Sequence, residues 1–279
     1  MIYRFFQWLK NHRMANVALV ICYSLFLLFA HDAFVNLSVG VMNSLSLPVF
    51  QRVVLTGMIV FILLFLSIVF WLARKVRLEV LSAGYFVASL LLLVVHFFVL
   101  TEMNVEFIHA LMYGGLAVLM YPLIGRKGGS VILCLPVMVV DEWYQLVVLF
   151  PHYTNFFEFN DILLDLFGAG LFVSMFGMFG VFQKQEHTSL AKRVEFWFLA
   201  CSVACITLLM ATCVIVPYAV DACSNTWFVL NKLPEMSEFW FTHPVIGSVF
   251  HILKPVEGLG AIYLVCLAYL GMDSMSFKK

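Results

Sequence analysis

The stretch VVLTGMIVFILLFLSIVFWLA, residues 53–73, contains no charged side chain. At 1.5 Å per residue, a helix of this length spans about 30 Å, which is the thickness of the hydrocarbon core of a bilayer. The whole chain of 279 residues has the same character, with 63% hydrophobic and 11% charged residues and a mean hydropathy of +1.01. Soluble domains do not carry this much apolar surface. The sequence therefore predicts a polytopic helical membrane protein.

Further apolar runs of similar length divide the chain into eight predicted spans, which makes it an all-α protein with a single transmembrane domain over residues 1–279. The first span follows Arg4, Lys10 and Arg13 but lacks a small-residue cleavage site, so we expect it to stay attached as a membrane anchor. The predicted spans are 15–35, 53–73, 80–101, 107–125, 129–150, 161–183, 195–217 and 244–272.

The basic residues indicate how the spans are oriented. With eight spans, 13 of the 16 Lys and Arg residues fall on one side of the membrane. The exceptions are Arg52 and Lys232, on the opposite side, and Lys254, within the last span. Because basic residues flank spans on the cytoplasmic side, both termini are predicted to be cytoplasmic and the chain to lie in the plasma (cytoplasmic) membrane.

Most of the acidic residues are predicted on the outer side, so the net charge of zero hides a polarised molecule. The basic residues form thin flanks and no patch, which excludes nucleic acid as a partner. Cationic, metal-bridged or hydroxyl-rich ligands suit the acidic face better, and membrane lipids are the expected partners.

Three motifs place ionisable residues inside apolar helices. They read Glu106-Phe-Ile-His109-Ala-Leu-Met-Tyr113, Asp141-Glu142-Trp-Tyr-Gln145 and Asp161-Ile-Leu-Leu-Asp165. A charge in hydrocarbon costs at least ~2.5–3.5 kcal/mol, so such residues usually face the protein interior and serve a function there.

Helical geometry and topology predict that the three motifs meet. The fourth span runs inward, the fifth returns outward and the sixth runs inward, so the motifs lie at similar depth in the outer half of the membrane. Short connections make these helices neighbours. We expect one polar pocket lined by Glu106, His109, Tyr113, Asp141, Glu142, Gln145, Asp161 and Asp165.

The chemistry of this pocket leaves two interpretations open. Crowded carboxylates repel one another, and a divalent metal ion, His109, His96, Lys254 or a bound ligand would relieve that repulsion. The metal-ligand candidates are Glu106, His109, Asp141, Glu142, Asp161 and Asp165, although no spacing specific to a metal motif accompanies them. The alternative is a structural network of hydrogen bonds between helices.

The order and spacing of the three motifs over residues 102–183 resemble the VanZ-like membrane proteins, with residues 1–101 and 184–279 as flanking helices. The resemblance implies a protein of the bacterial cell envelope, in the inner membrane, associated with antibiotic resistance of the glycopeptide type. One departure is the turn Phe150-Pro151-His152-Tyr153, where family members often carry an arginine. His152 is the only nearby candidate to replace that arginine at an anionic headgroup.

Three functions follow as hypotheses. The first is a non-enzymatic protein that binds a lipid-linked envelope precursor or an amphiphile, which the depth of the pocket and the resemblance favour. The second is a metal-dependent enzyme acting on a lipid headgroup, with His109 as proton shuttle. The third is a proton-coupled transporter, although no inverted repeat is visible.

The segments outside the motifs give weaker signals. Lys254, before Pro255 in the predicted last span, is expected either to pair with Glu257 or to reach the acidic pocket. His96 is more typical of a packed polar group. The aromatic segment 219–243 predicts an interfacial belt or lid. Six cysteines, including Cys213, fall in predicted spans and only Cys223 lies outside, so we expect no disulfide.

Overall fold

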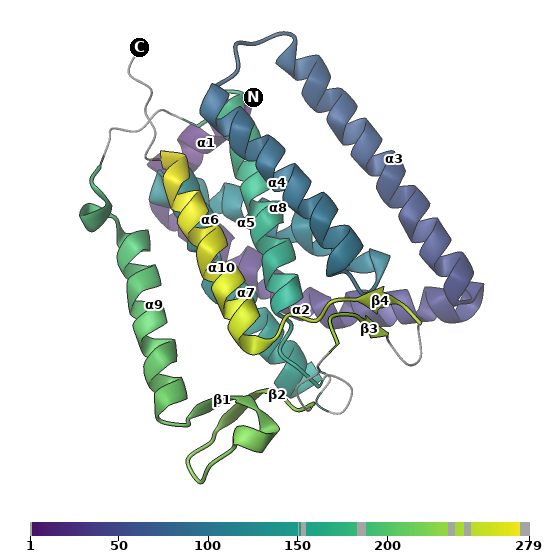
Figure 1. Ribbon diagram of the computed structural model, residues 1–279. Coiled ribbons are helices and arrows are strands. Elements are labelled where there is room, and N and C mark those ends of the chain that lie inside the picture. The colour runs from purple at the N-terminus through teal and green to yellow at the C-terminus, as the bar shows by residue number, and fades with distance from the viewer. Residues whose placement is uncertain are drawn as a thin grey trace.

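The computed structural model describes residues 2–149, 151, 155–182, 188–233, 238–242 and 247–273. These residues form a helical bundle with four short strands at one end (Figure 1). A 3-10 turn, η1 (Asn104–Phe107), leads into α5, and a π-helical segment, η2 (Gln145–Leu149), continues α7. The α-helices are α1 (Ile2–Asn11), α2 (Arg13–Leu45), α3 (Leu47–Ala73), α4 (Val80–Val99), α5 (Ile108–Ile124), α6 (Lys127–Ile132), α7 (Leu135–Tyr144), α8 (Phe159–Met178), α9 (Val194–Ala211) and α10 (Pro255–Leu270). The strands are β1 (Ile215–Tyr218), β2 (Phe228–Asn231), β3 (Phe241–Thr242) and β4 (Val249–Phe250).

Among the described residues, eight helical stretches are long and apolar enough to cross a membrane. They follow the predicted spans in order, so the chain fits a multi-pass integral membrane protein. The placement of the termini and the identity of the membrane stay predictions. The stretches are Arg13–Leu45, Leu47–Ala73, Val80–Val99, Asn104–Ile124, Lys127–Leu149, Phe159–Met178, Val194–Ala211 and Pro255–Asp273.

Several predicted boundaries were wrong, and three of them bear on the site or on the strands. Helix α2 continues ten residues beyond the predicted end at 35, to Leu45. Helix α9 stops at Ala211 and is followed by β1, which pairs in parallel with β2. Helix α10 begins at Pro255 rather than at 244, because proline favours the first helical turn and drives the residue before it to an extended conformation. Lys254 therefore precedes the helix.

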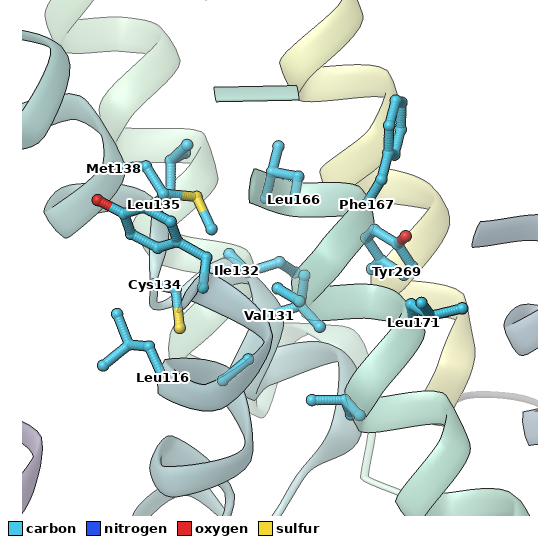
Figure 2. Packing of buried hydrophobic residues seen from close by; sticks show 14 of the residues in the cluster. Leu116, Val131, Ile132, Cys134, Leu135, Met138, Leu166, Phe167, Leu171 and Tyr269 are labelled. Atoms are coloured by element: carbon cyan, nitrogen blue, oxygen red, sulfur yellow. The ribbon is translucent and has the colours of Figure 1, made fainter. Parts of the chain in front are cut away.

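Helix α8 lies at the centre of the bundle, packed against α4, α5, α6, α7 and α10, and nearly all of its residues are buried. Figure 2 shows Leu166, Phe167 and Leu171 of α8 among side chains of the neighbouring helices. Two glycines allow this close packing, since a Cβ at Gly168 would meet the backbone of Ala110 in α5 and one at Gly170 would meet the Tyr269 ring in α10. By contrast, α2 and α3 expose most of their apolar side chains, as lipid-facing helices do.

Ion pairs join the helices at the end of the bundle opposite the strands. Arg126 donates two hydrogen bonds of 2.6 Å to the carboxylate of Glu195 at the start of α9. Lys127 Nζ lies 2.7 Å from Glu79 Oε2, and the backbone N–H groups of Lys127 and Gly128 donate to the Asp273 carboxylate. These contacts connect α4, α6, α9 and α10.

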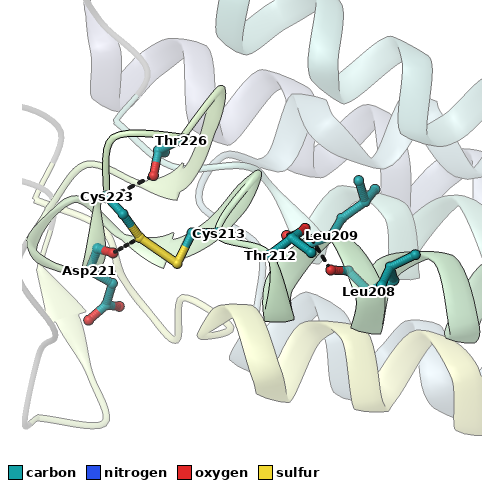
Figure 3. Close-up of a disulfide and its surroundings, with 7 residues drawn as sticks. All are labelled: Leu208, Leu209, Thr212, Cys213, Asp221, Cys223 and Thr226. Atoms are coloured by element: carbon teal, nitrogen blue, oxygen red, sulfur yellow. Dashed lines mark hydrogen bonds between the residues drawn. A yellow bond between two sulfur atoms is a disulfide. The ribbon is translucent and has the colours of Figure 1, made fainter.

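The prediction of no disulfide was wrong, because Cys213 and Cys223 are bonded to each other (Figure 3). Since α9 ends at Ala211, Cys213 lies beyond the helix rather than inside a span. The disulfide closes the loop that carries β1 and holds it near β2. The structure therefore has a covalent link at the end of the bundle that carries the strands.

The contact at Gly168 gives a stability prediction. In Gly168→Ala the added methyl group would collide with the Ala110 backbone, which cannot rotate away, so we expect a loss of about 1–3 kcal/mol. The measurement is the unfolding temperature of purified protein in detergent. The matched control is Gly84→Ala on α4, where a Cβ meets nothing within 4 Å, and this variant should be as stable as the parent or slightly more so. Equal unfolding temperatures for the two variants would contradict the prediction.

Candidate functional site

A cavity of about 390 Å³ lies between α2, η1, α5, η2 and the start of α8. Its polar lining comes from four separate parts of the chain and consists of His31, Ser38, Glu102, Glu106, His109, Gln145, Glu158 and Asp161. Apolar residues of α2, among them Phe34, Val35, Val39 and Met42, form the facing wall. The cavity therefore combines an acidic side with an apolar side.

The first motif enters the cavity through η1 and α5. Glu106 accepts hydrogen bonds from the backbone N–H groups of Glu102 and Met103, at 3.1 and 2.8 Å, and so closes the turn before α5. His109 follows one turn later and is buried. One more turn along, Tyr113 is fully buried and donates a 2.9 Å hydrogen bond to Asp141 Oδ2. The 3.6-residue period thus places these three side chains on one face.

Three motif residues converge on one point. His109 of α5, Glu142 of α7 and Asp161 of α8 each offer a ligand atom, and these atoms lie within 4.8 Å of one another. All three residues are buried. His109 and Asp161 line the cavity, and Glu142 lies beside them and accepts a 3.0 Å hydrogen bond from the Gln145 side chain. The second motif ends in the π-helical segment η2, a type of distortion that is frequent at functional sites.

Two further carboxylates lie deeper in the bundle. Asp165 is completely buried, and its Oδ1 is 3.4 Å from His109 Nδ1. Asp141 Oδ2, which accepts the hydrogen bond from Tyr113, lies 3.9 Å from His31 Nδ1. Among the described residues, no hydrogen-bond partner is found for either Asp165 oxygen, for Asp141 Oδ1 or for His109 Nδ1. Buried polar atoms normally have a partner, so this site contains unsatisfied bonding capacity.

The structure thus brings eight of the nine predicted site residues into one region. Lys254 is the exception, since it precedes α10, its backbone N–H donates to Glu257, and it is not among the residues that line the cavity. His96 is buried and contacts the backbone oxygen of Asn160 at 2.8 Å, as a packed polar group. His152 lies outside the described residues.

Four polar members of the cavity were not among the predicted site residues: His31, Ser38, Glu102 and Glu158. The His31 ring packs edge-on against the His109 ring, with 5.3 Å between their centroids, although the two residues are far apart in the chain. The sequence did contain a signal for His31, because the pair His31-Asp32 lies within the otherwise apolar first predicted span. Glu158 was assigned only to the outer face of the protein, because the predicted sixth span began three residues later.

Comparisons with family models, with curated proteins and with solved structures return no match. The resemblance to VanZ-like proteins therefore stays a prediction carried by the three motifs, and the site has to be interpreted from its own geometry.

Glu102 and Glu158, which flank the membrane-spanning helices, have shifted pKa values. Burial and, secondarily, the nearby Asp161 carboxylate raise the pKa of Glu102 to about 7. Burial, Asp161 and Glu102 raise the pKa of Glu158 well above its ordinary value. Both carboxyl groups therefore hold their protons at a pH where an exposed glutamate has lost them.

These shifts give a prediction about pH. The folded protein binds a proton on Glu102 that the unfolded chain releases above about pH 4.5, so this stabilisation is complete below that pH and is lost as the pH rises through about 7. The raised pKa of Glu158 acts in the same direction. The unfolding temperature should fall across this interval, and Glu102→Gln should flatten the fall. Asp32→Asn, which removes an exposed acid of α2, is the control and should follow the parent protein. A Glu102→Gln curve with the parent's slope would refute the assignment.

Proposed function

We propose that this membrane protein binds an amphiphile, with the polar headgroup in the acidic cavity and the apolar tail in an adjoining groove. The observation that carries the proposal is a second cavity of about 380 Å³ beside the first. The two cavities share the lining residues Phe34, Ser38, Phe50, Val105 and Ile108. A cavity with an acidic side next to an apolar cavity matches the two parts of a lipid-like molecule.

The lining of the second cavity supports a tail site. It lies between α2, α3 and α5 and is almost entirely apolar, with Leu37, Val41, Val54, Met58, Phe61 and Leu111 among its members. Burying a methylene group there is worth about 0.8 kcal/mol, so even a short acyl or isoprenoid segment contributes strongly. Because α2 and α3 are the helices with the most exposed apolar surface, a tail would reach this groove directly from the bilayer.

The orientation is also part of the proposal, with the cavity in the outer leaflet and both termini in the cytoplasm. Two independent features support it. Arg126, Lys127 and Arg193 gather at the end opposite the strands, as the positive-inside rule expects for the cytoplasmic side. The disulfide between Cys213 and Cys223 is at the other end, and disulfides persist in oxidising compartments outside the cytoplasm.

The resemblance to VanZ-like proteins extends the proposal to the bacterial envelope. On that basis the amphiphile is a lipid-linked envelope precursor or an amphiphilic antibiotic, and the biological outcome is glycopeptide resistance. The acid-rich lining favours a headgroup that carries amines or hydroxyls, or one that is bridged by a cation.

The tail groove gives a test of binding. Gly57 lines the groove, and a Cβ there meets nothing within 4 Å, so Gly57→Phe should place its ring in the space where a tail would lie. We expect it to lower the amount of lipid retained during purification about tenfold, the effect of displacing about two methylenes. Lipid is measured by mass spectrometry of extracts from the purified protein. The matched control, Gly84→Phe on the exposed face of α4, should retain lipid like the parent, and equal retention by both variants contradicts a tail site.

The orientation has its own test. Cys213→Ser frees Cys223, which a membrane-impermeant maleimide should then label in intact cells if this end is outside. The control is the parent protein, in which the disulfide blocks Cys223 until a reductant is added. Labelling that requires cell lysis would place this end in the cytoplasm and overturn the orientation.

A further inference from the structure

We propose that His109, Glu142 and Asp161 bind a divalent cation at the wall of the acidic cavity. The three residues come from α5, α7 and α8, and their ligand atoms already lie within 4.8 Å of one another. Ligands bound to one cation at about 2.0–2.2 Å would be about 3–3.5 Å apart, which small side-chain rotations can reach. The inference deepens the proposed function and rests on it for the identity of the remaining ligand.

The donor set indicates the class of metal. One imidazole nitrogen and two carboxylate oxygens suit a cation of intermediate hardness, such as Zn²⁺ or Mn²⁺. A site for Ca²⁺ or Mg²⁺ would be built from oxygen atoms alone. With three protein ligands, at least one coordination position is left for another molecule.

The surroundings of His109 provide an independent observation. A metal-binding histidine usually donates its second ring N–H to a carboxylate, which fixes the ring and its tautomer. Here His109 Nδ1 lies 3.4 Å from Asp165 Oδ1, and both groups are buried and without a hydrogen-bond partner among the described residues. Coordination through Nε2 would make Nδ1 a donor to Asp165 and so satisfy both groups at once. Gln145 performs the same orienting role for Glu142.

The charge balance of the site points the same way. Glu142 and Asp161 lie close to the buried Asp141 and Asp165, and the histidines beside them are His31 and His109. Removing several carboxylates from water is costly unless cations or hydrogen bonds compensate. A divalent cation between Glu142 and Asp161 would offset two of these negative charges.

The open coordination position gives the cation a role in the proposed function. His109 and Asp161 line the cavity, so a cation between them is within reach of a headgroup in it. Its free position would accept an oxygen atom of a phosphate or hydroxyl group, whether from a lipid headgroup or from free inorganic phosphate. The cation would thus allow an acidic cavity to bind an anionic headgroup.

The test measures metal directly. The full-length protein is stripped with a chelator in detergent, incubated with Zn²⁺ or Mn²⁺, passed over a desalting column and analysed for bound metal by mass spectrometry. We expect about one ion per chain and, because binding stabilises the folded state, a higher unfolding temperature. Glu142→Gln and Asp161→Asn should weaken binding more than a hundredfold, and Asp165→Asn about 10- to 100-fold as an orienting residue. Asp32→Asn is the control and should bind like the parent.

Each outcome supports or overturns the proposal. No bound metal and no thermal shift in the parent protein overturns it, and this comparison does not depend on whether any variant folds. Equal binding by the parent, Glu142→Gln and Asp161→Asn overturns the assignment to these residues. Lipid analysis of the same samples separates the two proposals. Retained lipid without bound metal supports amphiphile binding and overturns the cation site. Bound metal without retained lipid supports the cation site and contradicts amphiphile binding. Addition of inorganic phosphate to lipid-free, metal-loaded protein distinguishes a free anion from a headgroup as the further ligand.

Discussion

The backbone contact between Gly168 of α8 and Ala110 of α5 sets the geometry on which the site depends. Ala110 directly follows His109, and Gly168 lies about one turn after Asp165, so the distance between the helices at this contact fixes how closely those two side chains approach. A side chain at position 168 would hold the helices apart and separate the pair. The same helix carries Asp161 one turn earlier. The packing of two helix backbones therefore decides where two carboxylates and a histidine meet.

Removing so many carboxyl groups from water is costly unless hydrogen bonds or cations offset the cost, and the hydrogen bonds in this structure are unevenly distributed among them. Glu106 accepts hydrogen bonds from two backbone N–H groups, Asp141 accepts one from the Tyr113 hydroxyl, and Glu142 accepts one from the Gln145 side-chain amide. Asp165 receives no hydrogen bond from the described residues. Glu106 is thus satisfied by the chain itself, whereas both Asp165 oxygens, Asp141 Oδ1 and His109 Nδ1 have no hydrogen-bond partner among the described residues. This gradient is the physical reason to look for a cation or a headgroup at His109, Glu142 and Asp161 rather than at Glu106.

The sequence predicted the features that depend on local patterns. Apolar length predicted the eight spans, and helical periodicity predicted that Glu106, His109 and Tyr113 share a face. It could not predict that His31 lines the cavity, because α2 reaches the cavity only through tertiary packing. Helical periodicity does not indicate which other helix a membrane-spanning helix packs against. Lys254 was expected in the pocket because the last span was extended through Pro255. The disulfide was missed for a similar reason, since the predicted seventh span continued past Cys213.

The two ends of the bundle differ in a way that matters for binding. At the end opposite the strands, Arg126 with Glu195 and Lys127 with Glu79 join α4, α6 and α9 by charged hydrogen bonds. Around the cavities, α2 and α3 contribute few buried residues and present apolar side chains outward. Regions with few buried contacts open at lower free energy than the core. Under the proposed function, the wall formed by α2 and α3 would separate to admit a tail from the bilayer, while α5, α7 and α8 would hold the polar groups in place for the headgroup.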